Sequence, residues 1–143
     1  MVTSRYLEEK DYLLLSKSLE NDPYHKDTDL SFFLEEGTVC SVFEYDGNPV
    51  LFVRGKPIYY KDYTMIQLDI QYLNNEDTKK NIKVMLEGFP NIEKRAKENK
   101  FSGFFFISNV KLLRKFCIKY LGFEEFNEDA LIKLIDKAPE DVI

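Results

Sequence analysis

The sequence contains no tryptophan, two cysteines, one histidine and no apolar run that approaches the ~18 residues of a membrane-spanning helix. Two cysteines and one histidine are too few for a disulfide framework or a zinc site. Cys40 and Cys117 lie in apolar stretches, so we predict two reduced, buried thiols and no metal site. The N-terminus has no apolar signal region, so we expect a cytoplasmic protein that does not insert into a membrane.

The length, composition and net charge of the chain indicate what kind of protein it is. The 143 residues are enough for one domain with a real core, and we expect a single domain over 1–143 with a frayed tail at 136–143. With 44% hydrophobic and 31% charged residues, the chain is typical of a globular protein. The net charge of −5 argues against broad nucleic-acid binding, which needs positive surface.

Hydrophobic periodicity and turn signals predict an α/β (α+β) protein in the order β-α-α-β-β-β-α-β-α-β-β. We expect a mixed, mostly antiparallel, twisted sheet of about 6–7 strands with about 4 helices. The predicted strands are Val2–Tyr6, Val39–Tyr45, Val50–Arg54, Met65–Tyr72, Phe101–Ser108, Phe123–Phe126 and Leu131–Ile135. The predicted helices are Tyr12–Glu20, Leu30–Glu36, 78–99 and Val110–Leu121. Their predicted N-caps are Asp11 for the first, Asp27 or Asp29 for the second, and Asp77 or Thr78 for the third.

The central stretch of the chain runs from Met65 to Lys100. Alternating apolar residues predict a strand over Met65–Tyr72, and a polar loop then leads into a helix whose inner face is expected to hold six apolar residues. These are Ile82, Met85, Leu86, Phe89, Ile92 and Ala96. A strand end that faces a helix N-terminus concentrates N–H groups, which suits an anionic ligand.

Three segments carry a resemblance to a known family. They are Arg5 with Asp11-Tyr12, Ser108-Asn109 before an amphipathic helix, and Leu121-Gly122-Phe123 after it. Together with the element order, they make the chain resemble the GNAT superfamily of acetyl-CoA-dependent N-acetyltransferases over nearly its whole length. The resemblance implies that coenzyme A lies along Ile70, Gln71, Tyr72 and Leu73, with its phosphates near Thr78, Lys79 and Lys80 and a further contact from Asn109.

The phosphate loop departs from the family pattern. Typical members of the GNAT superfamily carry a glycine-rich loop between the fourth strand and the following helix. The glycines let main-chain N–H groups approach a diphosphate closely. Here residues 73–81 contain no glycine, and Glu76 and Asp77 would repel a diphosphate. Lys79, Lys80 and Lys83 could compensate as point charges, or could form a solvated first helical turn.

The resemblance also implies catalytic roles. Asp69, on the central strand, is the candidate base that takes a proton from the acceptor amine. The family's usual acid is a tyrosine at the position of Ile118, so Tyr120, on the expected inner helix face, is a weak candidate. His25 lies in a loop that borders the acceptor in this family, although a lone surface histidine is usually incidental. The basic residues Lys111, Arg114, Lys115 and Lys119 are expected to form an outer helix face.

Two functional hypotheses follow, and a different α/β fold stays open as a third. The first is an acetyl-CoA-dependent N-acetyltransferase that acts on an unknown amine and has an unusual phosphate loop. The second is a catalytically degenerate protein of the same fold that acts through protein–protein contacts. Small tailed-phage proteins of this fold resemble the chain in lacking the glycine loop and in keeping an aromatic strand, an asparagine, a helix and then a glycine. That resemblance would place the chain in the host cytoplasm or virion. A homodimer remains open under either hypothesis.

Overall fold

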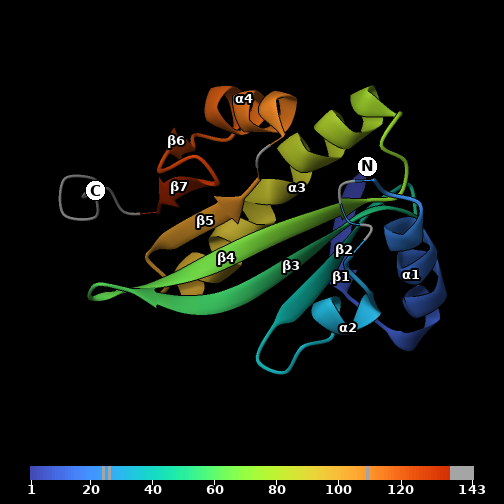
Figure 1. The fold of residues 1–143 in the computed structure, drawn as a ribbon, viewed down its shortest axis with the longest axis horizontal. Helices are drawn as coiled ribbons and strands as arrows, with labels where there is room; N and C mark the ends of the chain where they lie inside the picture. Colours follow the sequence, from blue (N-terminus) through green and yellow to red (C-terminus); the bar gives the residue numbers. More distant parts are fainter. Residues whose placement is uncertain (24, 26, 109, 136–143) are drawn as a thin grey trace. The chain divides into compact units, whose positions relative to one another are not determined.

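The computed structural model describes residues 1–23, 25, 27–108 and 110–135. The described residues form a seven-stranded sheet in the order β1-β2-β3-β4-β5-β7-β6 and four α-helices (Figure 1). The strands are β1 (Val2–Tyr6), β2 (Val39–Tyr45), β3 (Asn48–Tyr60), β4 (Tyr63–Tyr72), β5 (Gly103–Ile107), β6 (Glu124–Glu125) and β7 (Ala130–Leu134). The helices are α1 (Tyr12–Glu20), α2 (Leu30–Phe33), α3 (Thr78–Glu98) and α4 (Lys111–Tyr120). The predicted fold class and element order are confirmed.

Hairpin turns organise the antiparallel part of the sheet. Asp46 and Gly47 both have positive φ angles, 50° and 84°, as a two-residue type I′ turn requires. This turn joins β2 to β3 as the sequence predicts. Gly55-Lys56-Pro57 predicts a break in the chain, and the segment from Ile58 to Tyr63 is expected as an irregular extension or a loop. Instead, β3 continues to Tyr60 and turns into β4 at Lys61, whose φ is 54°. Strand residues therefore lie on both sides of that turn.

The described chain divides into two compact units, and each has its own core. Met1–Gly55 and Ile70–Gly88 make up the first unit, and Lys56–Asp69 with the described residues from Phe89 onward make up the second. The expectation of a single domain over 1–143 stays a prediction.

In the first unit, helices cover both faces of β2. Cys40 and Val42 point to one face, where they join Leu15 and Leu19 of α1 and Phe33 of α2 in a buried cluster. Phe43 points to the other face, since side chains alternate along a strand. A Cβ atom built on Gly88 of α3 would lie 2.7 Å from the Phe43 ring, so α3 packs on that opposite face.

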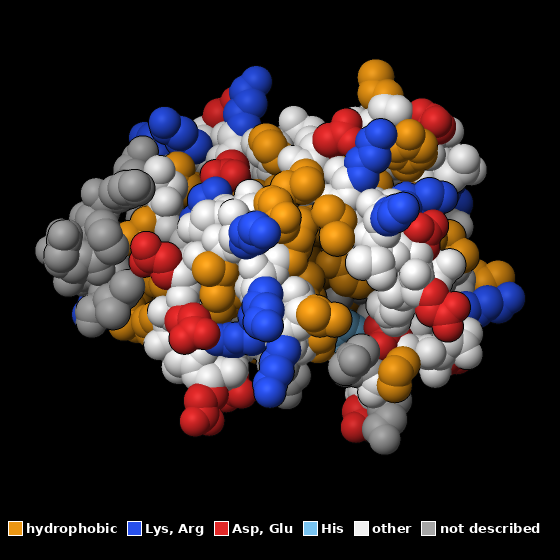
Figure 2. Space-filling view, turned by 90° about the horizontal axis from the view of Figure 1, so that it is seen from above, with side chains coloured by type: hydrophobic (Ala, Val, Ile, Leu, Met, Phe, Trp, Pro, Cys, Tyr) orange, Lys and Arg blue, Asp and Glu red, His pale blue; other side chains and the backbone are white. Residues whose placement is uncertain are grey.

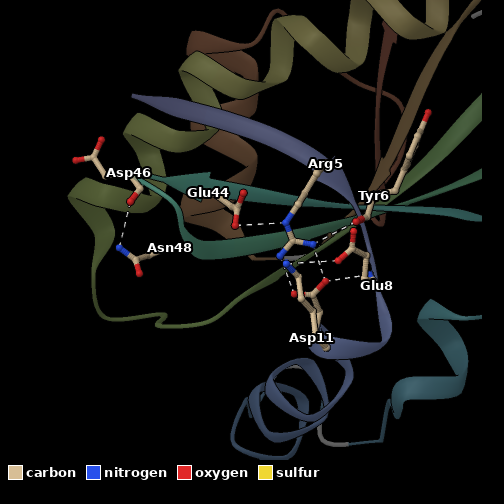
Figure 3. Close-up of polar contacts among 8 residues, drawn as sticks. Arg5, Tyr6, Glu8, Asp11, Glu44, Asp46 and Asn48 are labelled. Atoms are coloured by element: carbon tan, nitrogen blue, oxygen red, sulfur yellow. Dashed lines mark hydrogen bonds and ion pairs between the residues drawn. The ribbon is translucent and has the colours of Figure 1, made fainter.

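A group of charges ties β1 to the start of α1 (Figure 3). The Arg5 guanidinium donates to both carboxylate oxygens of Asp11, at 2.7 and 2.8 Å, and its Nε lies 3.3 Å from Glu44. Asp11 also accepts the main-chain N–H of Glu8 at 2.9 Å. The prediction that Asp11 caps α1 with its side chain is therefore wrong: its carboxylate caps the 3₁₀ turn before the helix and pairs with Arg5.

Helix α2 is shorter than predicted and is held by a buried arginine. Of the two predicted caps, Asp27 and Asp29, it is Asp29 that caps the helix, by accepting the main-chain N–H of Ser31 at 2.9 Å. The helix ends at Phe33, well before Gly37, whose φ of 85° closes a later turn. Arg54 is buried, donates to the carbonyl of Phe32 at 2.8 Å, stacks 3.8 Å from its ring and pairs with Glu35.

In the second unit, phenylalanines pack on both faces of β5. Phe105 joins Met65 and Ile132 in one buried cluster, and Tyr60 and Phe126 stand edge-on to it. Phe104 and Phe106 point the other way, to Phe89 of α3 and to Phe123. β5 runs parallel to β4 and antiparallel to β7, and β6 pairs antiparallel with β7, which agrees with the predicted mixed, mostly antiparallel sheet.

The inner faces of three helices differ in part from prediction. In α3 the buried residues include Val84, Met85 and Phe89, whereas Ile82 and Leu86 are exposed. The stripe therefore follows 81, 84–85, 88–89, 92 and 96, one residue away from the predicted track at its start. Leu14 in α1 and Leu112 in α4, which are expected from their apolar character on the inner faces of their helices, are likewise exposed. In the described part of the chain, no helix has the length and apolar character to cross a membrane.

Candidate functional site

The end of β4 carries four of the residues expected to contact a coenzyme. The parallel register with β5 runs from Met65↔Gly103 to Leu68↔Phe106, and β4 continues to Tyr72. Ile70 and Gln71 are buried. The main-chain N–H of Leu73 donates to the carbonyl of Val50 at 3.0 Å, so this donor is already used within the protein.

The side chain of Gln71 is the centre of a polar network in the first unit. It is fully buried, and its Nε2 atom lies 2.9 Å from Ser18 Oγ, 3.0 Å from Asp22 Oδ2 and 3.0 Å from the carbonyl oxygen of Tyr72. Ser18 Oγ itself donates to that same carbonyl at 2.8 Å. Because buried polar groups need partners, this network fixes the end of α1 to the end of β4.

His25 completes this network from the loop between α1 and α2. Its Nδ1 atom contacts Gln71 Oε1 and lies 3.3 Å from Asp22 Oδ2. The Asp22 side chain is only 4% exposed, whereas 34% of the His25 side chain is accessible. Only a small part of the histidine surface is visible in the space-filling view (Figure 2). The structure thus brings together a buried carboxylate, a buried amide and a half-buried imidazole.

The loop before α3 satisfies much of its own hydrogen bonding. The Asn74 side chain accepts the main-chain N–H of Glu76 at 3.0 Å, and its carbonyl accepts that of Asp77 at 3.3 Å. Asp77 Oδ1 lies 3.4 Å from the main-chain nitrogen of Lys80, so it serves as the predicted cap. The Asn81 amide donates to the carbonyl of Asn74 at 2.9 Å and closes the loop.

Two main-chain donors remain for an anion at this helix end. Within the described residues, the N–H groups of Thr78 and Lys79 have no acceptor in the protein, and both side chains are exposed. The Lys80 ammonium lies 3.8 Å from Asp77. The first turn of α3 therefore has two free N–H groups and two lysines that attract an anion, and the carboxylate of Asp77, which repels one.

The remaining predicted site residues lie in different settings. Asp69 is half-buried on β4. Tyr120 is 53% exposed and stacks on Phe116, so its predicted inward position is wrong. Asn109 lies outside the described residues. Arg114 is not a solvated outer-face residue, because it donates to the carbonyls of Ser108 and Asn127 at 2.7 and 2.9 Å.

The described residues provide neither a metal-binding group nor an accessible thiol. Among the described residues, no group of three or more His, Cys, Asp or Glu side chains could hold a metal ion. Both cysteines are free and buried as predicted, and burial raises the pKa of each thiol to about 12. A thiol with so high a pKa is a poor nucleophile near neutral pH.

A hollow of about 350 Å³ lies in the first unit, away from the network around Gln71. Its lining includes Tyr6, Tyr12, Leu34, Glu35 and Cys40. Glu35 pairs with Arg54 and the Cys40 thiol keeps its proton, so we assign no chemistry to this hollow.

Comparison with known proteins gives the fold of the chain. No family model and no curated protein matches the sequence. Solved structures match over almost their whole length, and the chain has the fold of the GNAT acetyltransferases. A probable acetyltransferase from Staphylococcus epidermidis ATCC 12228 is 17% identical, with a TM-score of 0.68 over 94% of this chain and 99% of that one.

Two further structures extend this likeness. The aminoglycoside acetyltransferase AAC(6')-Ib in complex with coenzyme A is 15% identical, with a TM-score of 0.69 over 94% of this chain and 95% of that one. A GNAT-family acetyltransferase from Staphylococcus aureus MU50 is 12% identical, with a TM-score of 0.69 over 95% and 100%. The likeness is therefore one of fold at low sequence identity.

Sequence reasoning missed the network of Ser18, Asp22, His25 and Gln71 as a unit. The alternation along Met65–Tyr72 predicts Gln71 on the polar face of a strand, and no local pattern pairs it with His25. The pairing joins residues 46 positions apart, and it becomes visible only when α1 is placed beside β4. The single useful signal was a lone histidine three residues after an aspartate.

Proposed function

We propose that the protein binds acetyl-CoA and transfers its acetyl group to a primary amine. The observation that carries the proposal is the likeness of fold over more than nine-tenths of both chains to acetyltransferases, one of them in complex with coenzyme A. In this proposal the pantetheine arm lies along Ile70, Gln71, Tyr72 and Leu73. The phosphates meet the free N–H groups of Thr78 and Lys79 and the lysine side chains, with Asn109 as a further contact.

Acetyl transfer requires a neutral amine and a leaving thiolate that gains a proton. Asp69 and Tyr120 stay candidates for the base and the acid, and the variants Asp69→Asn and Tyr120→Phe test these roles. A half-buried carboxylate suits a base in its ionised form. The phenol of Tyr120 is exposed, by contrast, so it could donate a proton only to a ligand that lies on the solvent side of α4.

The test is an acyl-transfer assay on the full chain. Acetyl-CoA is incubated with kanamycin, spermidine and a lysine-containing peptide, free coenzyme A is measured, and each amine is weighed by mass spectrometry. A mass gain of one acetyl group on an amine, with matching coenzyme A release, would support the proposal. Absence of binding and of release would refute it.

A second candidate function is favoured by the loop before α3. The acceptor groups of Asn74 and Asp77 occupy N–H donors that a diphosphate would need, and Glu76 and Asp77 add negative charge. A protein that keeps the fold but acts through protein–protein contacts, such as a phage accessory or virion-associated protein, would have no need of these donors. We propose a cytoplasmic location for either candidate, in the host cell or virion if a phage encodes the chain.

A further inference from the structure

The hydrogen bonds of Gln71 determine the orientation of its amide. Its Nε2 atom lies close to a carboxylate oxygen of Asp22 and to the carbonyl oxygen of Tyr72, and a carbonyl oxygen can only accept a hydrogen bond. Ser18 Oγ donates its proton to the Tyr72 carbonyl, so it accepts from the same nitrogen. A reversed amide would place an oxygen against these acceptors with no proton between them.

The amide orientation in turn determines which nitrogen of His25 carries the proton. Gln71 Oε1 can only accept, and it contacts His25 Nδ1. Nδ1 therefore carries a hydrogen and donates it, with Asp22 Oδ2 as a second acceptor at 3.3 Å. In the neutral ring, Nε2 is then left with a free lone pair.

The lone pair of Nε2 is available to an outside molecule. Within the described part of the chain, Nε2 has no hydrogen-bond partner, and a third of the side chain is accessible. The buried Asp22 carboxylate lies close enough to compensate a positive charge that the ring gains on protonation. A half-buried imidazole in one tautomer, backed by a carboxylate, is the arrangement of a general base.

We propose that Nε2 of His25 is the base that takes the proton from the acceptor ammonium, with Gln71 and Asp22 as positioning residues. The inference rests on the proposed acetyl transfer. One proton of the ammonium moves to Nε2 and from there to solvent. The neutral nitrogen forms a C–N bond to the thioester carbonyl carbon, the C–S bond breaks, and the second nitrogen-bound proton goes to the departing thiolate.

The first test observes the tautomer directly. The chain has one histidine, so a long-range proton–nitrogen correlation spectrum of the ¹⁵N-labelled full chain shows one imidazole. We expect a protonated Nδ1 and an unprotonated Nε2, and the opposite pattern, which free histidine favours, would overturn the inference. Gln71→Leu should weaken the Nδ1–H preference, because only Asp22 Oδ2 then remains as an acceptor. Gln67→Leu, on the same strand, should leave it unchanged.

The second test separates proton removal from folding and binding. His25→Asn keeps a donor near the Nδ1 position and removes Nε2, so we expect kcat for spermidine to fall by about 100-fold with unchanged affinity for acetyl-CoA. Hydroxylamine is already neutral near pH 7.5, so its turnover should change little in the same variant. An equal loss for both acceptors would overturn the role of His25 as a base.

The outcomes also separate this inference from the proposed function. If wild type and His25→Asn bind acetyl-CoA and turn over spermidine at the same rate, the role of His25 is refuted and acetyl transfer stands. If turnover is lost in Asp69→Asn but kept in His25→Asn, the base is Asp69. If the wild-type chain binds no acetyl-CoA, the proposed function fails first, and the catalytic role of His25 fails with it.

Discussion

Asp77 Oδ1 lies 3.4 Å from the main-chain nitrogen of Lys80, on the first turn of α3. A carboxylate in this position stabilises the helix, because it satisfies a free N–H group and faces the positive end of the helix dipole. The same carboxylate occupies a donor that an anionic ligand would use. The capping of α3 and the proposed binding of a coenzyme phosphate therefore have opposite requirements at this residue.

Asp77→Asn should strengthen the binding of coenzyme A by about fivefold, because it removes one negative charge beside the phosphates. Calorimetric titration of the variant and the wild type measures this change. Glu98→Gln, at the other end of α3, removes the same charge and should leave the affinity unaltered. An equal gain in both variants would show a general charge effect instead of a local one.

The ion pair of Arg5 and Asp11 predicts how stability depends on pH. The hydrogen bond from Arg5 is the main reason why the pKa of Asp11 lies below its usual value. A lowered carboxyl pKa stabilises the fold above about pH 4, the unfolded-state value, and this stability is lost as the pH falls through the folded-state pKa.

Asp11→Asn should therefore lower the free energy of unfolding by about 2 kcal/mol at pH 7 and flatten its fall in acid. Urea unfolding of both proteins between pH 3 and pH 7 measures this difference. The control is Asp62→Asn, in the exposed turn between β3 and β4. Parallel curves for wild type and Asp11→Asn would contradict the ion-pair account.

Gly103 marks a close approach between β5 and β7. A Cβ atom at this position would lie 2.2 Å from the carbonyl oxygen of Lys133 and 3.0 Å from Cα of Leu134. Since both are backbone atoms of a paired strand, Gly103→Ala should cost about 3 kcal/mol. Chemical denaturation measures the loss, and Ser102→Ala should change the free energy of unfolding by less than about 0.5 kcal/mol. An unchanged stability of Gly103→Ala would mean that the two strands lie farther apart.

Neither cysteine should react with a thiol reagent in the folded protein. Burial raises the pKa of Cys40 and Cys117 to about 12, so very little thiolate exists at pH 8. Ellman's reagent should detect no thiol until guanidinium unfolds the chain, and should then detect both. Fast reaction of the native protein would contradict the burial of the two thiols. It would also complicate the measurement of released coenzyme A, because the protein thiols would react with the same reagent.

Local signals in the sequence predict the strands and turns well where short-range physics decides them. The turn at Asp46-Gly47 requires two positive φ angles, and few residue pairs adopt them as readily as Asp-Gly does. The Phe-rich run at 101–108 predicts a doubly buried strand, and β5 is one. Such features depend on neighbours within a few residues, so the sequence alone suffices.

Other features depend on contacts between residues far apart in the sequence, which local sequence patterns do not reveal. Gly55-Lys56-Pro57 looks like a break, but β3 passes through it because β2 pairs with it as far as Gly55. The inner face of α3 follows Val84 instead of Ile82, since Gly88 fits against Phe43. The roles of Gln71 and His25 arise from a pairing between distant elements, which no local pattern encodes.

Calorimetric titration of the full chain with acetyl-CoA measures whether the protein binds the coenzyme that the proposed acetyl transfer requires. Desulfo-CoA serves as a second ligand that keeps the pantetheine and the phosphates, and ATP serves as a control that lacks pantetheine. We expect saturable binding of both coenzyme compounds with Kd below about 1 mM, and no binding of ATP. Absence of heat and of any thermal shift at millimolar acetyl-CoA would contradict the proposed acetyl transfer and would favour a protein that acts through protein–protein contacts.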